Sequence, residues 1–183
     1  FASALPDWVA KQWTEERFSL MDVGCAQGDA SEVLTIRFPQ VHFVGVDVSE
    51  VGIQKASDTY TSGEFKRIEP DWSDLPAAEF ILCSNTIEHL TDWRARLAIL
   101  CRHASKAVFV LVPYCEEELE PEHVARFDER ALPTSVDGKR LAFVRVVDTR
   151  HLPASRWNGK QMLAVYGSPD FSIRSRSRRA RGD

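Results

Sequence analysis

One segment near the start of the chain restricts the fold more than any other. Residues 21–30 read Met-Asp-Val-Gly-Cys-Ala-Gln-Gly-Asp-Ala, between an apolar run at 18–21 and a helix-like segment at 31–38. Small residues in such a turn let the backbone approach a ligand closely, and the first N–H groups of the following helix are available to it. A second apolar run, 41–46, ends in Asp47 about twenty residues after the turn, where a carboxylate can accept hydrogen bonds from two ribose hydroxyls. This order of strand, turn, helix and strand predicts an α/β fold with a ligand cradle.

The spacing of small residues in this turn separates two classes of cofactor. A dinucleotide site places glycines at i, i+2 and i+5, and these positions hold Gly24, Ala26 and Asp29. Because Asp29 would repel a pyrophosphate, an NAD-linked dehydrogenase is disfavoured. The chain instead reads Asp22-x-Gly24-x-Ala26-x-Gly28, which resembles motif I, D/E-x-G-x-G-x-G, of the class I S-adenosylmethionine-dependent methyltransferases. The resemblance implies S-adenosylmethionine as cofactor and S-adenosylhomocysteine as product, and Ala26 departs from the usual middle glycine.

Apolar runs and chain-breaking residues predict how the rest of the chain is organised. We expect strands at 18–24, 41–47, 64–68, 80–84, 107–112, 140–148 and 160–166. We expect helices at 5–17, 28–38, 49–60, 92–103 and 128–135, with Ser49 and Thr91 as caps. Five βα units followed by a hairpin resemble the same family over about residues 18–167. The resemblance implies an α/β fold, a Rossmann-like, doubly wound sheet of seven strands, mostly parallel with an antiparallel seventh strand.

This pattern divides the chain into three segments. Residues 1–17 are expected to form an N-terminal helix that packs onto the sheet or acts as a lid, and 18–167 the methyltransferase domain. The Arg/Ser-rich segment 168–183 is expected to be a disordered tail. The 183 residues, 44% of them hydrophobic, suffice for one domain with its own core. Because the chain begins at Phe1, flanking domains of a longer protein stay an open alternative.

The composition indicates which partners and which cellular compartment to expect. No apolar run approaches the roughly 18 residues that a membrane-spanning helix needs. The four cysteines lack C-x-x-C spacing and are expected to be reduced thiols of a cytoplasmic protein. The net charge of −4 would be more negative without the five arginines of residues 172–183. The body of the protein is therefore acidic, and nucleic acid is not an expected partner.

The resemblance to motif I assigns residues to the methionine and ribose side of the cofactor. It implies a methionine-side loop that consists of Asp22, Gly24, Cys25, Ala26 and Gly28. Asp47 would bind the ribose hydroxyls, and the following Val48 would pack against the adenine. Alternatively, residues 22–28 form an ordinary strand–helix turn, and Asp47 only caps the next helix.

Two further loops complete the expected cofactor site. Asp71 and Trp72 follow the third strand; in this family such an acid accepts a hydrogen bond from the adenine amino group, and its neighbour covers the ring. Asp74 is a rival for the acid, and the alternative is a polar loop with a tryptophan packed beneath it. Ser84 and Asn85 follow the fourth strand, and they should lie near the sulfonium because open α/β sheets bind ligands at the carboxyl ends of their strands.

Candidate catalytic groups follow the fourth and fifth strands. Residues 84–90 resemble the S-N-x-x-E-H-L segment of the bacterial branch of the family, types 11 and 23, which places Glu88 and His89 on a short helical turn. His123 lies within 121–128, which resembles the H-x-x-x-F segment of related bacterial enzymes. His123 is the first candidate for the base that deprotonates a hydroxyl or amine, and Glu88 and His89 are the second. Each could instead hold a backbone turn in place.

A more specific alternative is that these residues bind a metal ion. The small-RNA 2′-O-methyltransferases carry E-x-x-E-H after the fourth strand and more histidine after the fifth, and they bind a divalent metal. This chain retains Glu88, His89 and His123 but has Asn85 in place of the first glutamate. Because one carboxylate ligand is lost, we expect no metal. The three glutamates at 116–118 are expected to form a solvated loop.

These inferences predict an enzyme that moves a methyl group from S-adenosylmethionine to an oxygen or nitrogen of a small-molecule, sugar or glycan acceptor. The acceptor would be framed by the N-terminal helix, the loop after the fourth strand and residues 113–135. Two alternatives stay open. One is a non-catalytic cofactor-binding or scaffold domain of a larger protein, and the other is an RNA 2′-O-methyltransferase-like enzyme recruited by the arginine-rich tail.

Overall fold

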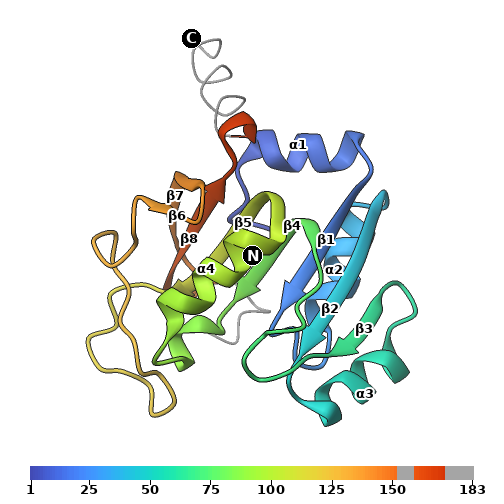
Figure 1. Ribbon diagram of the computed structural model, residues 1–183, viewed down its shortest axis with the longest axis horizontal. Helices are drawn as coiled ribbons and strands as arrows, with labels where there is room; N and C mark the ends of the chain where they lie inside the picture. Colours follow the sequence, from blue (N-terminus) through green and yellow to red (C-terminus); the bar gives the residue numbers. More distant parts are fainter. Residues whose placement is uncertain (152–158, 172–183) are drawn as a thin grey trace.

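The computed structural model describes residues 1–151 and 159–171, which build a twisted sheet with helices on both faces (Figure 1). The strand order is β3-β2-β1-β4-β5-β8-β7-β6. The strands are β1 Phe18–Val23, β2 Val41–Asp47, β3 Glu64–Arg67, β4 Ala78–Ser84, β5 Ala104–Pro113, β6 Ser135–Val136, β7 Lys139–Asp148 and β8 Lys160–Gly167. Strands β1 to β5 are parallel, whereas β8 is antiparallel to both β5 and β7. The Rossmann-like fold and its antiparallel strand are therefore confirmed.

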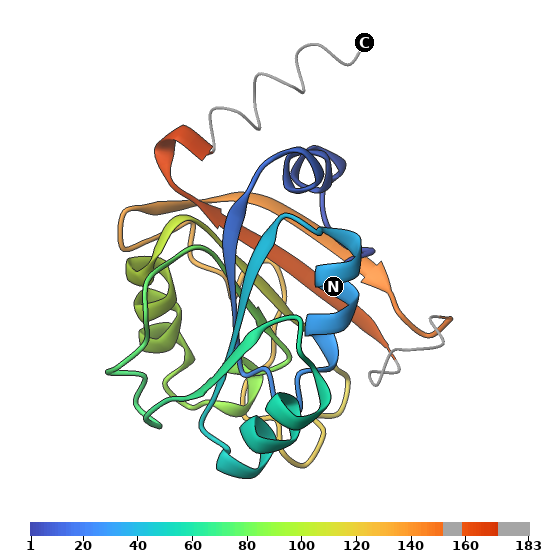
Figure 2. The same ribbon diagram turned by 90° about the vertical axis from the view of Figure 1, so that its right-hand side faces the viewer.

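Helices cover the two faces of this sheet. They are α1 Asp7–Glu15, α2 Asp29–Arg37, α3 Glu50–Thr59 and α4 Trp93–His103, with a 3-10 turn, η1, at Ile87–His89. Figure 2 shows α4 on one face and α1 and α2 on the other. Each face has its own core, into which α4 inserts Leu97 and Leu100 on one side while α1 and α2 insert Trp13 and Leu34 on the other. Strands buried on both faces explain the nearly continuous apolar runs in the sequence.

The N-terminal helix packs onto the sheet. Trp13 is fully buried and stacks on Phe18 with ring centroids 4.8 Å apart. Its indole also lies 5.2 Å from the rings of Phe80 and Phe109. Replacing a buried aromatic residue of this kind by alanine costs about 3–5 kcal/mol, so α1 belongs to the folded domain. The residues that precede it, 1–4, line a cavity at the carboxyl edge of the sheet.

The structure corrects two predictions in the C-terminal half. The described residues form eight strands rather than seven, because the two-residue β6 pairs with β7 at the sheet edge. No helix forms within residues 128–135. Instead, Oδ1 of Asp128 accepts hydrogen bonds from the N–H groups of Arg130 and Ala131 at 2.9 and 2.8 Å. This closes a single turn, and Pro133 cannot extend it into a helix because it has no N–H to donate.

The regular alternation of strand and helix is also less complete than predicted. Within the described residues, helices follow β1, β2 and β4, whereas loops follow β3 and β5. Pro70 and Pro76 interrupt the backbone hydrogen bonds that a helix after β3 would need. The cap of α4 is Asp92 rather than the predicted Thr91, and its carboxylate binds Arg96 one turn later at 2.8 Å. Ser49 caps α3 as predicted, accepting a hydrogen bond from the Gly52 N–H.

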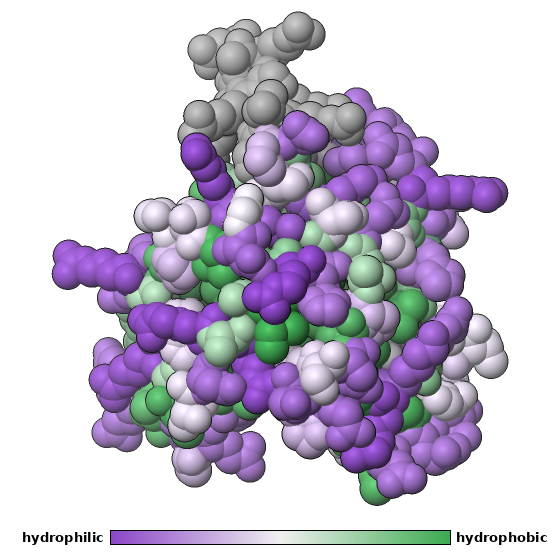
Figure 3. Space-filling view, viewed as in Figure 1, coloured by the Kyte–Doolittle hydropathy of each residue, from purple (hydrophilic) through white to green (hydrophobic). Residues whose placement is uncertain are grey.

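The folded part extends beyond the predicted domain boundary at residue 167. Phe171 is 5% exposed and lies 5.0 Å from the ring of Trp8. The remainder of the predicted tail, 172–183, lies outside the described residues. None of the helices in the described part is long and apolar enough to cross a membrane. Hydrophilic side chains cover most of the face shown in Figure 3, where apolar residues lie in small separate groups.

Candidate cofactor and acceptor site

A cavity of about 830 Å³ opens at the carboxyl ends of β1 and β4. The strand order reverses between these two strands, which is where open α/β sheets bind their ligands. The predicted cofactor residues that line the cavity are Asp22, Gly24, Cys25, Ser84 and Asn85. Further wall residues from the N-terminal segment, α2, β7 and β8 include Phe1, Ala4, Arg37, Val147 and Gln161.

A second hollow, of about 620 Å³, lies at the opposite edge of the sheet. Its lining includes Arg17, His42 and Glu79, which border the amino ends of β1, β2 and β4. The predicted site residues lie at the other edge, so the cavity of about 830 Å³ is the candidate site.

The turn after β1 requires glycine at two positions. Gly24 has φ +81°, and a β-carbon there would lie 2.3 Å from the hydroxyl oxygen of Thr86. Its N–H donates to the carbonyl oxygen of Val46 at 2.9 Å, which holds the turn against β2. Gly28 has φ +80° at the start of α2, where a β-carbon would meet the ring of Phe65 at 2.9 Å. The glycines of the motif are therefore needed to form the turn itself.

Asp47 ties this turn to the next helix. Its Oδ2 accepts a hydrogen bond from the N–H of Ala26 at 2.8 Å, and its Oδ1 accepts one from the N–H of Ser49 at 2.8 Å. Ala26 has φ +48°, in the left-handed region where glycine is the usual residue. Val48, next to Asp47, is 44% exposed. The carboxylate that was predicted to bind ribose is thus already aligned with the turn.

The end of β1 places a buried acid in the cavity wall. Asp22 is 4% exposed, and burial together with the charge of Asp47 raises the pKa of its carboxyl to about 7. A positively charged ligand would favour the ionised form, so this wall suits a cation. Burial also raises the pKa of the neighbouring Cys25 thiol well above its usual value, which leaves it a neutral, weakly reactive group.

The loop after β3 holds its polar residues in different ways. Asp71 is exposed, and hydrogen bonds from Ser73 lower the pKa of its carboxyl. Asp74 accepts a hydrogen bond from the N–H of Glu69 at 2.9 Å and so closes the loop. Trp72 has φ +61° and is 4% exposed, with its ring in the core on the α4 side. Both acids are exposed and each accepts a backbone hydrogen bond within the loop, whereas the indole of Trp72 is packed away from solvent.

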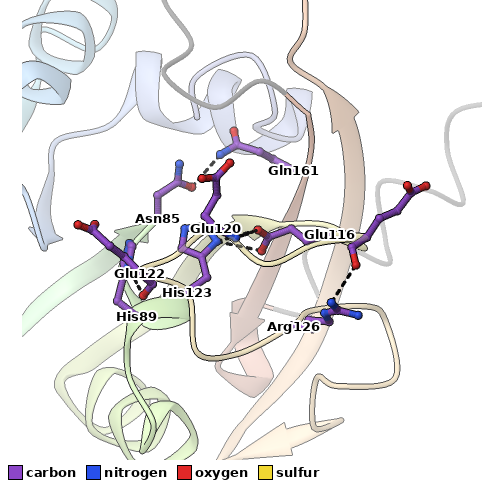
Figure 4. Close-up of polar contacts among 9 residues, drawn as sticks. Asn85, His89, Glu116, Glu120, Glu122, His123, Arg126 and Gln161 are labelled. Carbon is purple, nitrogen blue, oxygen red and sulfur yellow. Dashed lines mark hydrogen bonds and ion pairs between the residues drawn. The ribbon is translucent and has the colours of Figure 1, made fainter.

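Asn85 is fixed at the cavity wall by a residue that the motifs did not indicate. It has φ +52°, and its Oδ1 accepts a hydrogen bond from Nε2 of Gln161 at 2.7 Å (Figure 4). Gln161 is 5% exposed on β8 and, like Ser84 and Asn85, lines the cavity. The available signal in the sequence was a single amide at the start of the otherwise apolar run 161–166.

The three candidate catalytic residues, Glu88, His89 and His123, meet near Asn85 (Figure 4), although none of them is among the residues that line the cavity. The loop after β5 folds back onto η1, where the N–H of Val124 donates to the carbonyl oxygen of Glu88 at 2.8 Å. The rings of His89 and His123 have centroids 4.8 Å apart. Nδ1 of His123 lies 2.8 Å from Oε1 of Glu116 (Figure 4). Residues from two loops thus form one polar cluster.

Two acids of this cluster are buried. Glu116 has a side chain that is only 2% exposed, so the expectation of a fully solvated run at 116–118 is wrong at this position. Glu88 is 0% exposed, and burial raises the pKa of its carboxyl to about 7. Among the described residues, neither carboxylate oxygen of Glu88 has a hydrogen-bond partner of ordinary geometry. Burial without a partner is costly for an acid, which favours the neutral form in the protein without ligands.

Comparison with known proteins agrees with this geometry. A family profile described as a methyltransferase domain matches residues 2–151. The chain belongs to this family. Membership confirms the predicted class I S-adenosylmethionine-dependent methyltransferase and, with it, S-adenosylmethionine as the cofactor.

Curated relatives of this methyltransferase domain carry the name of one activity. Trans-aconitate 2-methyltransferase of Azoarcus sp. (strain BH72) is 25% identical over 155 residues, which cover 84% of this chain and 59% of the relative. The protein of the same name from Agrobacterium fabrum (strain C58 / ATCC 33970) is 23% identical over 120 residues, 65% of this chain and 47% of the relative. The chain therefore spans less than two thirds of the length of these relatives.

Solved structures share the fold of the methyltransferase domain at low identity. Magnesium protoporphyrin IX methyltransferase from Synechocystis PCC 6803, solved with bound S-adenosylhomocysteine, gives a TM-score of 0.68 at 14% identity over 88% of this chain and 80% of that chain. A SAM-dependent methyltransferase from Aquifex aeolicus gives 0.64 at 20% identity over 88% of both chains. At identities this low, the structural similarity establishes a shared fold and no more.

Proposed function

We propose that this methyltransferase domain transfers a methyl group from S-adenosylmethionine to an oxygen or nitrogen of a small-molecule, sugar or glycan acceptor. The observation that carries the proposal is the buried Asp22 in the wall of the cavity, with its pKa raised to about 7. Such a carboxylate is stabilised by a cation and repels a pyrophosphate. The methyl donor fits this wall because it carries an ammonium and a sulfonium and no phosphate.

The loops after β2 and β3 would hold the nucleoside part of the cofactor. Asp47 uses one lone pair of each carboxylate oxygen on backbone N–H groups and can accept ribose hydroxyls with the others. The exposed Asp71 would accept a hydrogen bond from the adenine amino group. The exposed Val48 would cover the adenine ring, a role that we assign to it rather than to Trp72 because the indole of Trp72 is packed in the core.

When bound, S-adenosylmethionine supplies a methyl carbon that is already activated by the positive charge of the sulfonium. The protein then has to align the acceptor and to favour the loss of its proton. Ser84 and Asn85 lie on the cavity wall where the sulfonium is expected, and Gln161 holds the Asn85 side chain in place.

His123 is the group that we propose as the base for the acceptor proton. Glu116 binds its Nδ1, which orients the imidazole in the way that catalytic histidines are oriented by carboxylates. Glu88 and His89 are the second candidates, since both lie in the same cluster.

The surroundings of the cavity support a small acceptor. Its outer walls come from residues 1–4 and from β7 and β8, so donor and acceptor share one cavity of about 830 Å³. The relatives named trans-aconitate 2-methyltransferase also support a small molecule over a macromolecule. The acidic body of the chain argues in the same direction against nucleic acid.

The first test is a calorimetric titration with S-adenosylhomocysteine, with NAD as the comparison ligand. We expect micromolar binding of the first alone. Asp47→Asn should weaken that binding about tenfold because one acceptor oxygen is lost. Asp58→Asn, which alters an exposed acid on α3, is the matched control and should change nothing.

A turnover assay then separates an enzyme from a scaffold. Donor consumption is measured against panels of small acids, sugars and amines. A protein that binds S-adenosylhomocysteine and never consumes the donor is a scaffold domain, and equal binding of NAD would contradict the cofactor site itself.

A further inference from the structure

We propose that Glu88, His89 and His123 bind a divalent first-row transition-metal ion beside the cofactor cavity. One potential ligand atom from each side chain lies within 4.8 Å of the other two. Two of these residues come from η1 and the third from the loop after β5, so the fold itself brings the ligand atoms together. This revises the expectation, drawn from the missing first glutamate, that the chain binds no metal.

The hydrogen bonds of the two imidazoles indicate which nitrogen of each ring carries the proton. Nδ1 of His89 lies 3.0 Å from the carbonyl oxygen of Glu122 (Figure 4), and because a carbonyl only accepts, this nitrogen carries the proton. Nδ1 of His123 lies 2.8 and 3.0 Å from the two carboxylate oxygens of Glu116, which likewise accept. In each neutral ring, Nε2 is then the nitrogen that offers a lone pair. Metal-binding histidines are commonly held in this way by a carbonyl or carboxylate on the other ring nitrogen.

Glu88 supplies an independent observation. Its side chain is 0% exposed, and neither carboxylate oxygen has a hydrogen-bond partner of ordinary geometry in the part of the chain that the structure describes. Buried polar atoms without partners are rare because each carries an uncompensated desolvation cost. An ion bound between this carboxylate and the two imidazoles would interact with the unpartnered oxygens. It would thereby offset the cost of burying Glu88.

The ligand set decides the class of ion. Two imidazole nitrogens with one carboxylate oxygen suit Zn²⁺, Co²⁺, Fe²⁺ or Mn²⁺, whereas Mg²⁺ and Ca²⁺ prefer oxygen ligands alone. Metal–ligand bonds of about 2.0–2.2 Å place tetrahedral ligands about 3.4 Å apart. Ligand atoms now up to 4.8 Å apart would therefore have to approach by up to about 1.4 Å, which side-chain rotations can supply.

Asn85 stands where the metal-binding relatives have a fourth ligand, and the three remaining residues can bind an ion without it. Its Oδ1 is bound to Gln161, so the residue serves the cavity wall instead of the cluster. Three protein ligands leave a coordination position open, as in catalytic zinc sites. An ion there would lower the pKa of an acceptor hydroxyl bound at that position, and the hydroxyl proton would pass to solvent water. His123 would then act as a metal ligand, in place of the role as direct base that is proposed above for the protein without an ion.

Ion binding is tested on the chelator-treated full chain without methyl donor, so the outcome does not depend on the proposed function. Co²⁺ is the spectroscopic probe and Zn²⁺ the competitor. We expect one Co²⁺ per chain, with visible absorption bands that Zn²⁺ abolishes. Glu88→Gln, His89→Ala and His123→Ala should each weaken Co²⁺ binding about 100-fold. His42→Ala, which removes an exposed histidine on β2, should leave it unchanged.

A milder variant and a second ion make the test decisive. Glu116→Gln should weaken Co²⁺ binding about ten- to hundredfold, because it removes the carboxylate that orients His123. Mg²⁺ should compete far more weakly than Zn²⁺. Absence of Co²⁺ binding, equal binding by the Glu88 and His123 variants, or equal competition by Mg²⁺ would each overturn the proposal. Intact Co²⁺ binding in a protein that does not bind S-adenosylhomocysteine would support the metal site and contradict the proposed function.

Discussion

Gln161 and Asn85 lie 76 positions apart in the sequence, yet Nε2 of Gln161 donates a 2.7 Å hydrogen bond to Oδ1 of Asn85. The bond joins the antiparallel strand β8 to the loop after β4, and both residues line the cavity. Asn85 has φ +52°, a conformation that asparagine tolerates better than most residues. A partner for its side chain therefore helps to hold the loop in its shape.

Replacing Gln161 by alanine should loosen this loop. We expect S-adenosylhomocysteine to bind about tenfold more weakly and the free energy of unfolding to fall by about 1 kcal/mol, because the side chain of Asn85 loses its hydrogen-bond partner. Calorimetry and urea unfolding measure the two effects. Gln54→Ala removes an exposed amide on α3 that pairs with Asp58, and it should alter neither quantity by more than experimental error.

Ala26→Gly should stabilise the protein. Ala26 has φ +48°, where a β-carbon costs about 1–2 kcal/mol, and the greater freedom of glycine in the unfolded chain offsets part of the gain. The net increase in the free energy of unfolding is expected to reach about 1 kcal/mol. Ala95→Gly, on the exposed side of α4, should instead lower it by about 0.5–1 kcal/mol. Equal losses in the two variants, measured by urea unfolding, would show that Ala26 carries no strain.

Asp22→Asn should stabilise the ligand-free protein more at pH 8 than at pH 5. The pKa of Asp22 is about 7 in the folded protein, against 3.8 for an unperturbed aspartate. Between these values the native state holds a proton that the unfolded state has lost, so the contribution of Asp22 to stability falls as the pH rises from about 4 to 7. Asparagine does not titrate, and the gain at pH 8 should exceed the gain at pH 5 by about 2–3 kcal/mol.

Urea unfolding of wild type and the Asp22→Asn variant at both pH values measures this difference. The same variant should bind S-adenosylhomocysteine more weakly, because the carboxylate that suits a cationic ligand is gone. A stability gain of equal size at pH 5 and pH 8 would mean that Asp22 titrates normally in the folded protein.

His123 and Glu116 should act as one unit in turnover. With an acceptor found by screening, His123→Ala should lower kcat about 100-fold and Glu116→Gln about tenfold, with little change in KM for the donor. The double variant should be no slower than His123→Ala, because Glu116 acts through His123. Glu117→Gln, an exposed neighbour, is the control. Multiplying effects in the double variant would show that the two residues work separately.

Sequence patterns predicted the parts of the site that depend on local chemistry. The glycines at 24 and 28 mark a turn that only glycine can form here, because Thr86 and Phe65 occupy the space of a β-carbon. The apolar runs located the central strands β1, β4, β5 and β8 because these are mostly buried on both faces. These two features placed the candidate site at the carboxyl edge of the sheet, where the structure has its cavity. Asp47 contacts the turn there, and its role toward ribose stays a prediction.

Contacts between distant segments could not be predicted in this way. Glu116 belongs to a run of acids that is indistinguishable from a solvated loop until the chain folds back and places it against His123. Trp72 sits beside an exposed acid, yet its ring turns into the core. In both cases the residues that bury the side chain lie in other parts of the sequence. The local sequence pattern therefore cannot predict the burial.

Two separate groups of elements supply the residues that line the cavity, which bears on how the acceptor preference of such a domain can change. The turns after β1 and β4 supply the part of the lining that we assign to the donor, whereas residues 1–4, β7 and β8 supply another part. The Gln161–Asn85 hydrogen bond connects the two. New acceptor preferences can therefore arise by exchanging the N-terminal segment and the terminal hairpin as a cassette while the donor part is inherited intact. Chimeras between such domains should retain cofactor binding as long as this one amide pair is kept.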